Sequence, residues 1–342
     1  MVDGELAPAE AVKAAVELVN AGVGLAQLGR KEEALGVWRQ VVARFSDATE
    51  PVLRYEVAKA LVNMGIALAQ LGRPEDAVGV YEQVVACFGD ATEPALREQV
   101  AKALFNMGAT LGQQVGRPQD AAPVYGQLVH RFGGAAEVAV RKWVAEGLLN
   151  LGVTLGQLGR AGDEMQAYDQ LVSLFGDATE PALRERAAKA LVYKGITLAQ
   201  LGQLEEAVRV WGLVIAGSGS ATEPVLREQV AKAQLNTGVV LGQLDRPRDE
   251  MVAYDELVAT FGDETEPLLR ELVAKALVNK GITLAQLGRL EEAAAAYGQV
   301  VSRYGDTSER ALREQVVRAM VNKDALRRTD RAQSSLQIAG QV

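Results

Sequence analysis

The side chains in this sequence that could carry chemistry are lysines, asparagines and glutamines repeated at helical spacing. Lys59, Asn63, Ile66 and Gln70 follow one another at intervals of four, three and four residues. On an α-helix this spacing places the side chains in one stripe. Lysine donates hydrogen bonds, and amide side chains both donate and accept them. Such a stripe could hold the main chain and the carboxylates of an extended acidic peptide.

The same stripe recurs along the chain, and Tyr193 occupies the position at which the other copies have asparagine. An aromatic side chain there would supply the kind of anchor that binding surfaces favour. Two interpretations stay open: the stripe binds a protein or peptide partner, or it is a solvated face whose asparagines bond to the adjacent helix. The candidate partner-binding residues are Lys59, Asn63, Lys102, Asn106, Asn150, Lys189, Tyr193, Lys232, Asn236, Lys275 and Asn279.

Catalytic constellations are missing from the sequence. His130 is the only histidine, so neither a Ser-His-Asp triad nor a histidine metal cluster can form. Cys87 is the only cysteine, which excludes an internal disulfide, and we expect it to pack inside a helix. No phosphate-binding GxxxxGK[ST] motif occurs. We therefore expect no catalytic residues, no cofactor and no metal, and a protein that is not an enzyme.

Composition narrows the environment and the partners. The net charge of −8 is spread through segments of mixed sign, which argues against a nucleic-acid partner. No apolar run approaches the length needed to span a membrane, and the N-terminus lacks the pattern of a signal peptide. We expect a cytoplasmic protein, and the abundance of Arg, Ala, Gly and Val resembles that of bacterial proteins from high-GC genomes.

Two markers show which elements must position the stripe. A glycine and, later, an aromatic residue each recur every 43 residues, with one step of 44 where Gln113-Gln114-Val115 adds a residue. A fixed period in this range is typical of a solenoid, in which each repeat packs against its neighbours. The glycines are Gly22, Gly65, Gly108, Gly152, Gly195, Gly238 and Gly281, and the aromatic residues are Trp38, Tyr81, Tyr125, Tyr168, Trp211, Tyr254 and Tyr297.

The sequence of each repeat predicts a longer first helix and a second helix of about fifteen residues. A Leu-Gly pair separates them, and its glycine can adopt the left-handed backbone conformation that commonly ends an α-helix. Asp245 replaces that glycine in the sixth repeat. A glycine inside a helix costs roughly 1 kcal/mol relative to alanine, so its recurrence predicts a neighbouring helix too close for a Cβ. At the first-helix start, Thr92 is a candidate cap, and Glu93 and Arg97 have the spacing of an ion pair within one helix.

These positions resemble the tetratricopeptide repeat family, through Leu61, Asn63, Met64, Gly65, Leu68, Gly72, Ala77 and Tyr81. The long period is similar to that of long-period members such as kinesin light chains. The resemblance implies an all-α fold, an α-solenoid superhelix of seven helix-pair repeats plus an incomplete eighth repeat that forms a C-terminal capping helix. It also implies that the first helices line a concave groove. Members that clamp a peptide carboxylate need an asparagine where this chain has Ile66 or Val239, so binding of such C-terminal tails is not expected.

We predict a disordered N-terminus over residues 1–7, a single solenoid over 8–333 and a flexible tail over 334–342. Repeats are expected to start near residues 8, 51, 94, 138, 181, 224, 267 and 310. Asp324 and Arg327 give the last helix a polar outer face, which suits a terminal cap and a monomer or weak dimer. Three departures from the repeat stand out: Tyr193 and Ser218 in the fifth repeat, Glu164 and Glu250, which replace a small residue of the second helix, and Trp143 and His130 around the irregular third junction.

The expected function is a protein-interaction scaffold or adaptor that binds a partner protein or an extended acidic segment in its groove. One alternative is a structural repeat protein that assembles with itself. Another is the regulatory subunit of a separately encoded enzyme, which the sequence does not separate from a scaffold.

Overall fold

Helices begin at the residues where the sequence predicts the repeat starts. In this computed structural model, which describes residues 7–218 and 224–339, the chain forms fifteen α-helices and one π-helical turn. The predicted disorder of residues 1–6 lies outside the described residues. The first helices are α1 (Pro8–Gln27), α3 (Pro51–Gln70), α5 (Pro94–Ala109), α7 (Val138–Gln157), α9 (Pro181–Gln200), α11 (Pro224–Gln243) and α13 (Pro267–Gln286). The second helices are α2 (Lys31–Phe45), α4 (Pro74–Phe88), α6 (Pro118–Phe132), α8 (Ala161–Phe175), α10 (Leu204–Ser218), α12 (Pro247–Phe261) and α14 (Leu290–Tyr304), and α15 (Arg310–Ala339) follows.

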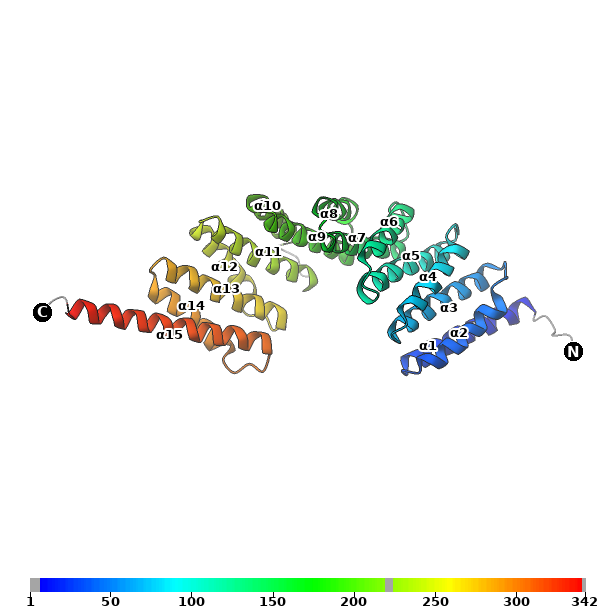
Figure 1. Ribbon diagram of the computed structural model, residues 1–342, viewed down its shortest axis with the longest axis horizontal. Coiled ribbons are helices and arrows are strands. Elements are labelled where there is room, and N and C mark those ends of the chain that lie inside the picture. Colours follow the sequence, from blue (N-terminus) through cyan, green and yellow to red (C-terminus); the bar gives the residue numbers. More distant parts are fainter. Residues whose placement is uncertain (1–6, 219–223, 340–342) are drawn as a thin grey trace. The chain divides into compact units, whose positions relative to one another are not determined.

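The chain divides into two compact units, an N-terminal unit of residues 1–187 and a C-terminal unit of residues 188–342. Within each unit a first helix packs on the second helix of its own repeat and on the next first helix, and each second helix packs on the first helix that follows (Figure 1). This is the all-α solenoid architecture that the sequence predicts. The continuity of one solenoid through residue 187 stays a prediction.

The recurring glycine and the recurring aromatic residue touch each other. A Cβ on Gly65 would lie 2.4 Å from the Tyr81 ring, and the seven equivalent distances run from 2.2 to 2.7 Å. No real Cβ fits at such a separation, so the predicted packing reason is confirmed. The obstacle is the aromatic ring of the same repeat, and not the neighbouring repeat. Where the ring is a tryptophan, it also donates to a backbone carbonyl, as Trp38 Nε1 does to Val19 O at 3.2 Å.

The turn between the two helices has the left-handed residue that the Leu-Gly pair predicts. Gly72 has φ of 74°, and Asp245 takes the same role with φ of 54°. The one extra residue of the third repeat forms a π-helical turn, Thr110–Gln114, at the end of α5. The Val115 N–H there bonds to Thr110 O at 3.0 Å, five residues back, as in a π-helix. Gly116 then closes the turn with φ of 72°.

The predicted ion pair within the first helix is wrong, because the arginine turns toward the next repeat. Arg54 bonds to Glu93 at 2.7 Å, and Arg97 bonds to Glu137 at 2.9 Å. Glu93 is itself the N-cap of α5, in extended conformation and without a side-chain cap bond, so Thr92 does not cap the helix. The carboxylate therefore lies at the start of its repeat, within reach of the preceding first helix.

The same arginines lie over the aromatic residue that ends the second helix of their own repeat. The distance from guanidinium carbon to ring centroid is 5.9 Å for Arg54 and Phe88 and 5.3 Å for Arg97 and Phe132. Arg184, at the same position of the fifth repeat, donates to the carbonyls of Ala178 and Thr179. We call the contact of such an arginine with a glutamate before the next repeat and with an aromatic ring an arginine junction. Besides those of Arg54 and Arg97, the described junctions are Arg141 with Glu180 and Phe175, Arg227 with Glu264 and Phe261, and Arg270 with Glu309 and Tyr304.

Two further expectations differ from the structure. The last helix, α15, continues to Ala339, where we expected a tail from residue 334, because this segment has no glycine or proline that would end a helix. The rest of that tail, 340–342, lies outside the described residues. Cys87 is exposed and not packed inside, since it lies on the outer side of α4. Among the helices that the structure describes, none is long and apolar enough to cross a bilayer.

Candidate partner-binding surface

All of the predicted partner-binding residues lie on first helices, and each is half-buried. We call the side of the first helices that carries them the stripe face. The apolar core positions of the first helices repeat with the same period as the stripe. The polar residues beside the core therefore occupy equivalent positions on each first helix.

Open clefts lie on the stripe face between consecutive first helices. In the N-terminal unit, a cleft of about 250 Å³ between α1 and α3 has Trp38 among its walls and Asn63, Ile66 and Gln70 along one side. In the C-terminal unit, a cleft of about 340 Å³ between α11 and α13 is lined by Asn279, Ile282, Gln286 and other residues. Equivalent stripe positions therefore line a cleft in both units.

Some stripe asparagines are engaged with the preceding repeat. Asn150 is hydrogen-bonded to Tyr125, and Asn279 to Tyr254. Burial raises the pKa of Tyr125 to about 12, while the bond from Asn150 lowers it. Asn106 donates to the carbonyl of Lys102 in its own helix at 2.8 Å. At Asn150 and Asn279 the amide is therefore bonded to a helix of the preceding repeat.

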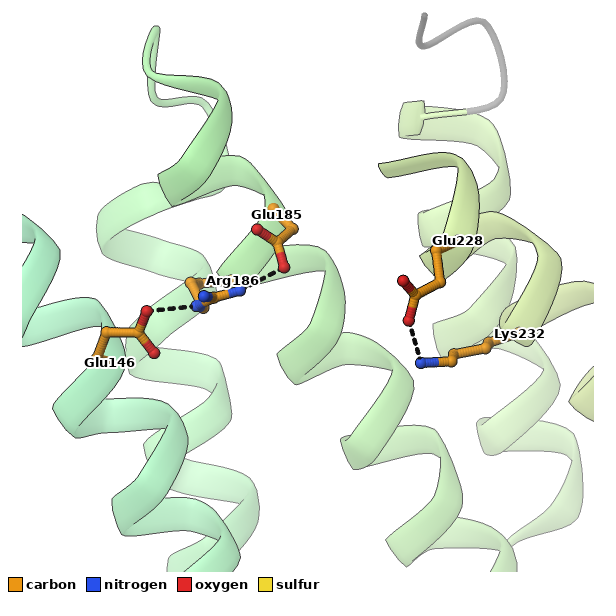
Figure 2. Close-up of polar contacts among 5 residues, drawn as sticks. All are labelled: Glu146, Glu185, Arg186, Glu228 and Lys232. Atoms are coloured by element: carbon orange, nitrogen blue, oxygen red, sulfur yellow. Dashed lines mark hydrogen bonds and ion pairs between the residues drawn. The ribbon is translucent and has the colours of Figure 1, made fainter. Parts of the chain in front are cut away.

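Most stripe lysines lie next to a glutamate about one turn earlier, a feature that our sequence analysis missed. Lys275 pairs with Glu271 at 2.6 Å, and Lys59 lies 3.6 Å from Glu56. Lys232 pairs with Glu228 in the same way (Figure 2). The signal was present as a Glu-x-x-x-Lys spacing in the repeat. The charge of each of these three lysines is therefore partly offset by a glutamate of its own helix.

One part of the stripe face gathers positive charge. Burial lowers the pKa of Lys102; Glu98 raises it, and the charges of Lys59 and Lys142 lower it further. In the N-terminal unit, Lys102 of α5 is thus close enough to a lysine of α3 and a lysine of α7 to be repelled by both. Lys189, in the C-terminal unit, lies 5.7 Å from the centroid of the Tyr193 ring.

The fourth repeat exchanges its charges. Glu146 occupies the position of the stripe lysine, and Arg186 donates to it at 2.8 Å and also pairs with Glu185 (Figure 2). Burial lowers the pKa of Arg186, but the bonds and charges of the two glutamates outweigh burial and raise it. The substitution of lysine by glutamate is compensated within the N-terminal unit.

The residues that depart from the repeat have separate roles. Trp143 packs on Phe105 with ring centroids 5.3 Å apart, and Phe105 in turn lies 6.2 Å from Tyr125. His130 is exposed. The side chain of Ser218 lies outside the described part. Glu164 and Glu250 are both buried, with 8% and 7% of their surface exposed.

Comparison with known proteins agrees with this architecture. Residues 19–92 and 274–307 match family models described as tetratricopeptide repeat. The solved structure of the apo form of RapI is similar at a TM-score of 0.58 with 12% identity, over 88% of this chain and 79% of RapI. BtubC from P. vanneervenii gives a TM-score of 0.50 with 14% identity, over 77% of this chain and 96% of BtubC. No curated protein matches the sequence.

Helix pairs stacked through their first helices, with clefts along one face, define a class of repeat protein whose fold is typical of interaction scaffolds. Both of the matched segments are therefore tetratricopeptide repeats, and the rest of the described chain repeats the same helix-pair fold. Proteins of this fold generally bind other proteins and typically have no enzymatic activity of their own.

Proposed function

We propose that this protein is a non-enzymatic scaffold that binds an extended segment of a partner protein on its stripe face. The observation that carries the proposal is the pair of clefts at equivalent stripe positions, one in each unit. Each offers amide side chains beside apolar ones, and this combination suits a main chain with alternating side chains. A buried floor with a polar rim is typical of protein interfaces.

The charges favour an acidic stretch of the partner on the N-terminal unit. The charges of Lys59 and Lys142 both act against the charge of Lys102 there, and a carboxylate placed beside Lys102 would relieve that repulsion. The lysines of the C-terminal unit support this less, because Lys232 and Lys275 lie closer to their glutamate partners than Lys59 does to Glu56. We place the acidic part of the partner across α3, α5 and α7.

The test begins by capturing the partner from the source organism and trimming it to the shortest segment that binds. Binding of this segment is then measured by calorimetry with wild-type protein and with a Lys59→Gln, Lys102→Gln, Lys142→Gln variant. We expect a Kd on the order of micromolar, and a loss of about tenfold or more in the variant. Binding should also weaken with salt, since exposed charges are screened within about 10 Å at 0.1 M.

A matched control removes three positive charges from a second helix, by Lys31→Gln, Arg39→Gln and Arg44→Gln in α2. It should bind like the wild type, and both variants should keep the helical circular dichroism. Equal affinity in all three proteins would contradict the proposal and move the search to the second helices. A partner that proves to be an enzyme whose activity changes on binding would select the regulatory-subunit alternative.

A further inference from the structure

The cleft of the C-terminal unit contains a buried carboxylate at its base. Glu250 lies in α12 with 7% of its surface exposed, and it lines the cleft together with Val239, Gln243 and Ile282 at the mouth. Repeats five and seven have Ala207 and Ala293 at the same position, both fully buried. A residue that the fold fills with a methyl group elsewhere is here an ionisable acid.

The first helix makes room for this acid. A Cβ on Gly242 of α11 would lie 2.9 Å from Glu250 Oε2, and a Cβ on Gly156 of α7 would lie 2.8 Å from Glu164 Oε2. Repeats five and seven have Ala199 and Ala285 at this position. Since glycine costs roughly 1 kcal/mol more than alanine inside a helix, the repeats that carry the glutamate accept a loss of helix stability to accommodate it.

The donors around Glu250 are arranged for an anion. Thr283 Oγ1 donates to Glu250 Oε1 at 2.7 Å, and the Tyr254 hydroxyl donates to the same carboxylate while itself bonded to Asn279. A carboxylate has about four acceptor positions, and the described residues occupy two of them at Glu250. Among the described residues that line this cleft, neither lysine nor arginine occurs. Burial raises the pKa of Glu250, and the bonds from Thr283 and Tyr254 lower it.

A buried carboxylate without a cation is costly, and a cation that reaches it gains a strong interaction. The cleft of about 340 Å³ opens to the surface between α11 and α13, and its mouth is apolar at Val239 and Ile282. That mouth suits the aliphatic stem of a long basic side chain, whose charged head would meet the carboxylate below. Arginine fits best, because its planar fork can fill two acceptor positions at once.

We propose that the cleft between α11 and α13 is a specificity pocket for an arginine side chain of the bound partner, with Glu250 as its counter-charge. The proposal deepens the scaffold function and rests on it for the presence of a partner. It gives the partner segment a basic residue on the C-terminal unit, in addition to the acidic stretch placed on the N-terminal unit. Glu164 lies against Gly156 in the same manner two repeats earlier, 86 residues before Glu250.

The pocket can be tested without the natural partner. The probe is the peptide acetyl-Gly-Gly-Arg-Gly-Gly-amide, titrated into the full chain labelled with ¹⁵N. Its control is the same peptide with citrulline, which keeps the shape of arginine but has no charge. We expect saturable shifts of the Gly242 and Thr283 amide signals with the arginine peptide, with a Kd on the order of millimolar, and at least about tenfold weaker binding of the citrulline peptide.

Two variants assign the effect to Glu250. Glu250→Gln keeps the size of the side chain and should reduce binding of the arginine peptide to the level of citrulline. Glu256→Gln removes an exposed acid from the same helix and should change nothing. Glu250→Ala combined with Gly242→Ala reproduces the sequence of repeat seven at both positions, so it should fold and not bind.

Equal binding of the two peptides, or full binding of the arginine peptide by Glu250→Gln, would overturn the proposal of an arginine pocket. Absence of any saturable shift would overturn it as well. None of these results affects the scaffold proposal, whose test uses the lysines of the N-terminal unit. Conversely, a scaffold that ignores those lysines could still show arginine binding at Glu250.

Discussion

Glycine and aromatic residue form the smallest unit of this architecture. The ring of Tyr254 is 1% exposed and lies where a Cβ of Gly238 would be, 2.3 Å from the nearest ring atom. Each ring replaces the side chain missing from the glycine, so the helix pair approaches more closely than alanine would allow. The distance between the two helices of a repeat is thus set by one residue in each.

Gly238→Ala should therefore destabilise the protein. The added methyl group must displace a buried ring, and overpacking of this kind costs about 1–3 kcal/mol. Gly212, in α10, is the matched control because it is exposed and a Cβ there would meet nothing within 4 Å. Gly212→Ala should stabilise by about 0.5–1 kcal/mol through helix propensity. Urea unfolding followed by circular dichroism measures both, and a shift of the same sign in the two variants would contradict this packing.

Individual residues were predicted unevenly from the sequence. The glycines and aromatic rings follow from period alone, because both belong to the core and the core repeats. The surroundings of Glu250 could not be predicted, since a single departure from a repeat has no periodicity and its hydrogen-bond partner Thr283 lies 33 residues later in the sequence. The stripe was found, but its charge was misjudged because Glu228 and Glu271 were not read together with their lysines.

At the scale of the elements, repeats are joined by arginine junctions. Arg97 leaves its helix α5, crosses the Phe132 ring and bonds to Glu137 at the start of the next repeat. Hydrogen bonds from backbone amides, first its own, lower the pKa of Glu137, and burial opposes them; Arg97 lowers it further. An acid whose pKa is lowered by folding stabilises the fold above its ordinary pKa, and this contribution is lost as the pH falls through the lowered value.

Arg97→Gln should therefore reduce stability at neutral pH and reduce it less in acid. The difference in unfolding midpoint between wild type and variant should shrink as the pH falls below about 4.3, the ordinary pKa of glutamate. Arg39→Gln removes an exposed arginine of α2 and serves as control, with a small difference at every pH. Thermal unfolding between neutral pH and pH 3 measures the effect, and a pH-independent difference for Arg97→Gln would refute the junction.

Helix starts and ends could be predicted almost to the residue, because proline begins every first helix of the seven pairs except α7, and a left-handed glycine, or Asp245 in the sixth repeat, follows each of them. The partners of the charged residues at those starts could not. Glu93 and Arg97 have the spacing of a helical pair, but Glu93 precedes the first turn in extended conformation, so its side chain leaves the helix surface. Local spacing alone does not reveal a bond that needs two repeats to be stacked.

At the scale of the molecule, all the described arginine junctions are oriented the same way along the chain. Each described junction joins an arginine of one repeat to a glutamate that precedes the next. The first repeat has Ala7 and Ala11 at the positions that hold glutamate and arginine in the second repeat, Glu50 and Arg54. An arginine of another copy would meet alanine, and not glutamate, at position 7.

We therefore expect a monomer or weak dimer, as the polar residues Asp324 and Arg327 of α15 also indicate. Light scattering coupled to size exclusion at micromolar concentration should give the mass of one chain, 36.5 kDa, or a concentration-dependent value below twice that. Ala7→Glu is an informative variant, because it restores the missing carboxylate and should increase association. A salt-resistant polymer of the wild type would instead support self-assembly.

The π-helical turn at Thr110–Gln114 bears on how such a gene can change. One inserted codon inside a helix rotates every later side chain of that helix by about 100°, which would turn core residues outward. Here the insertion falls in the last turn, and Gly116 ends the helix directly afterwards, so no core position inherits the rotation. The ends of first helices are thus places where single codons can be gained without loss of the fold. A chain made by duplication can acquire differences between its copies at these sites, one residue at a time.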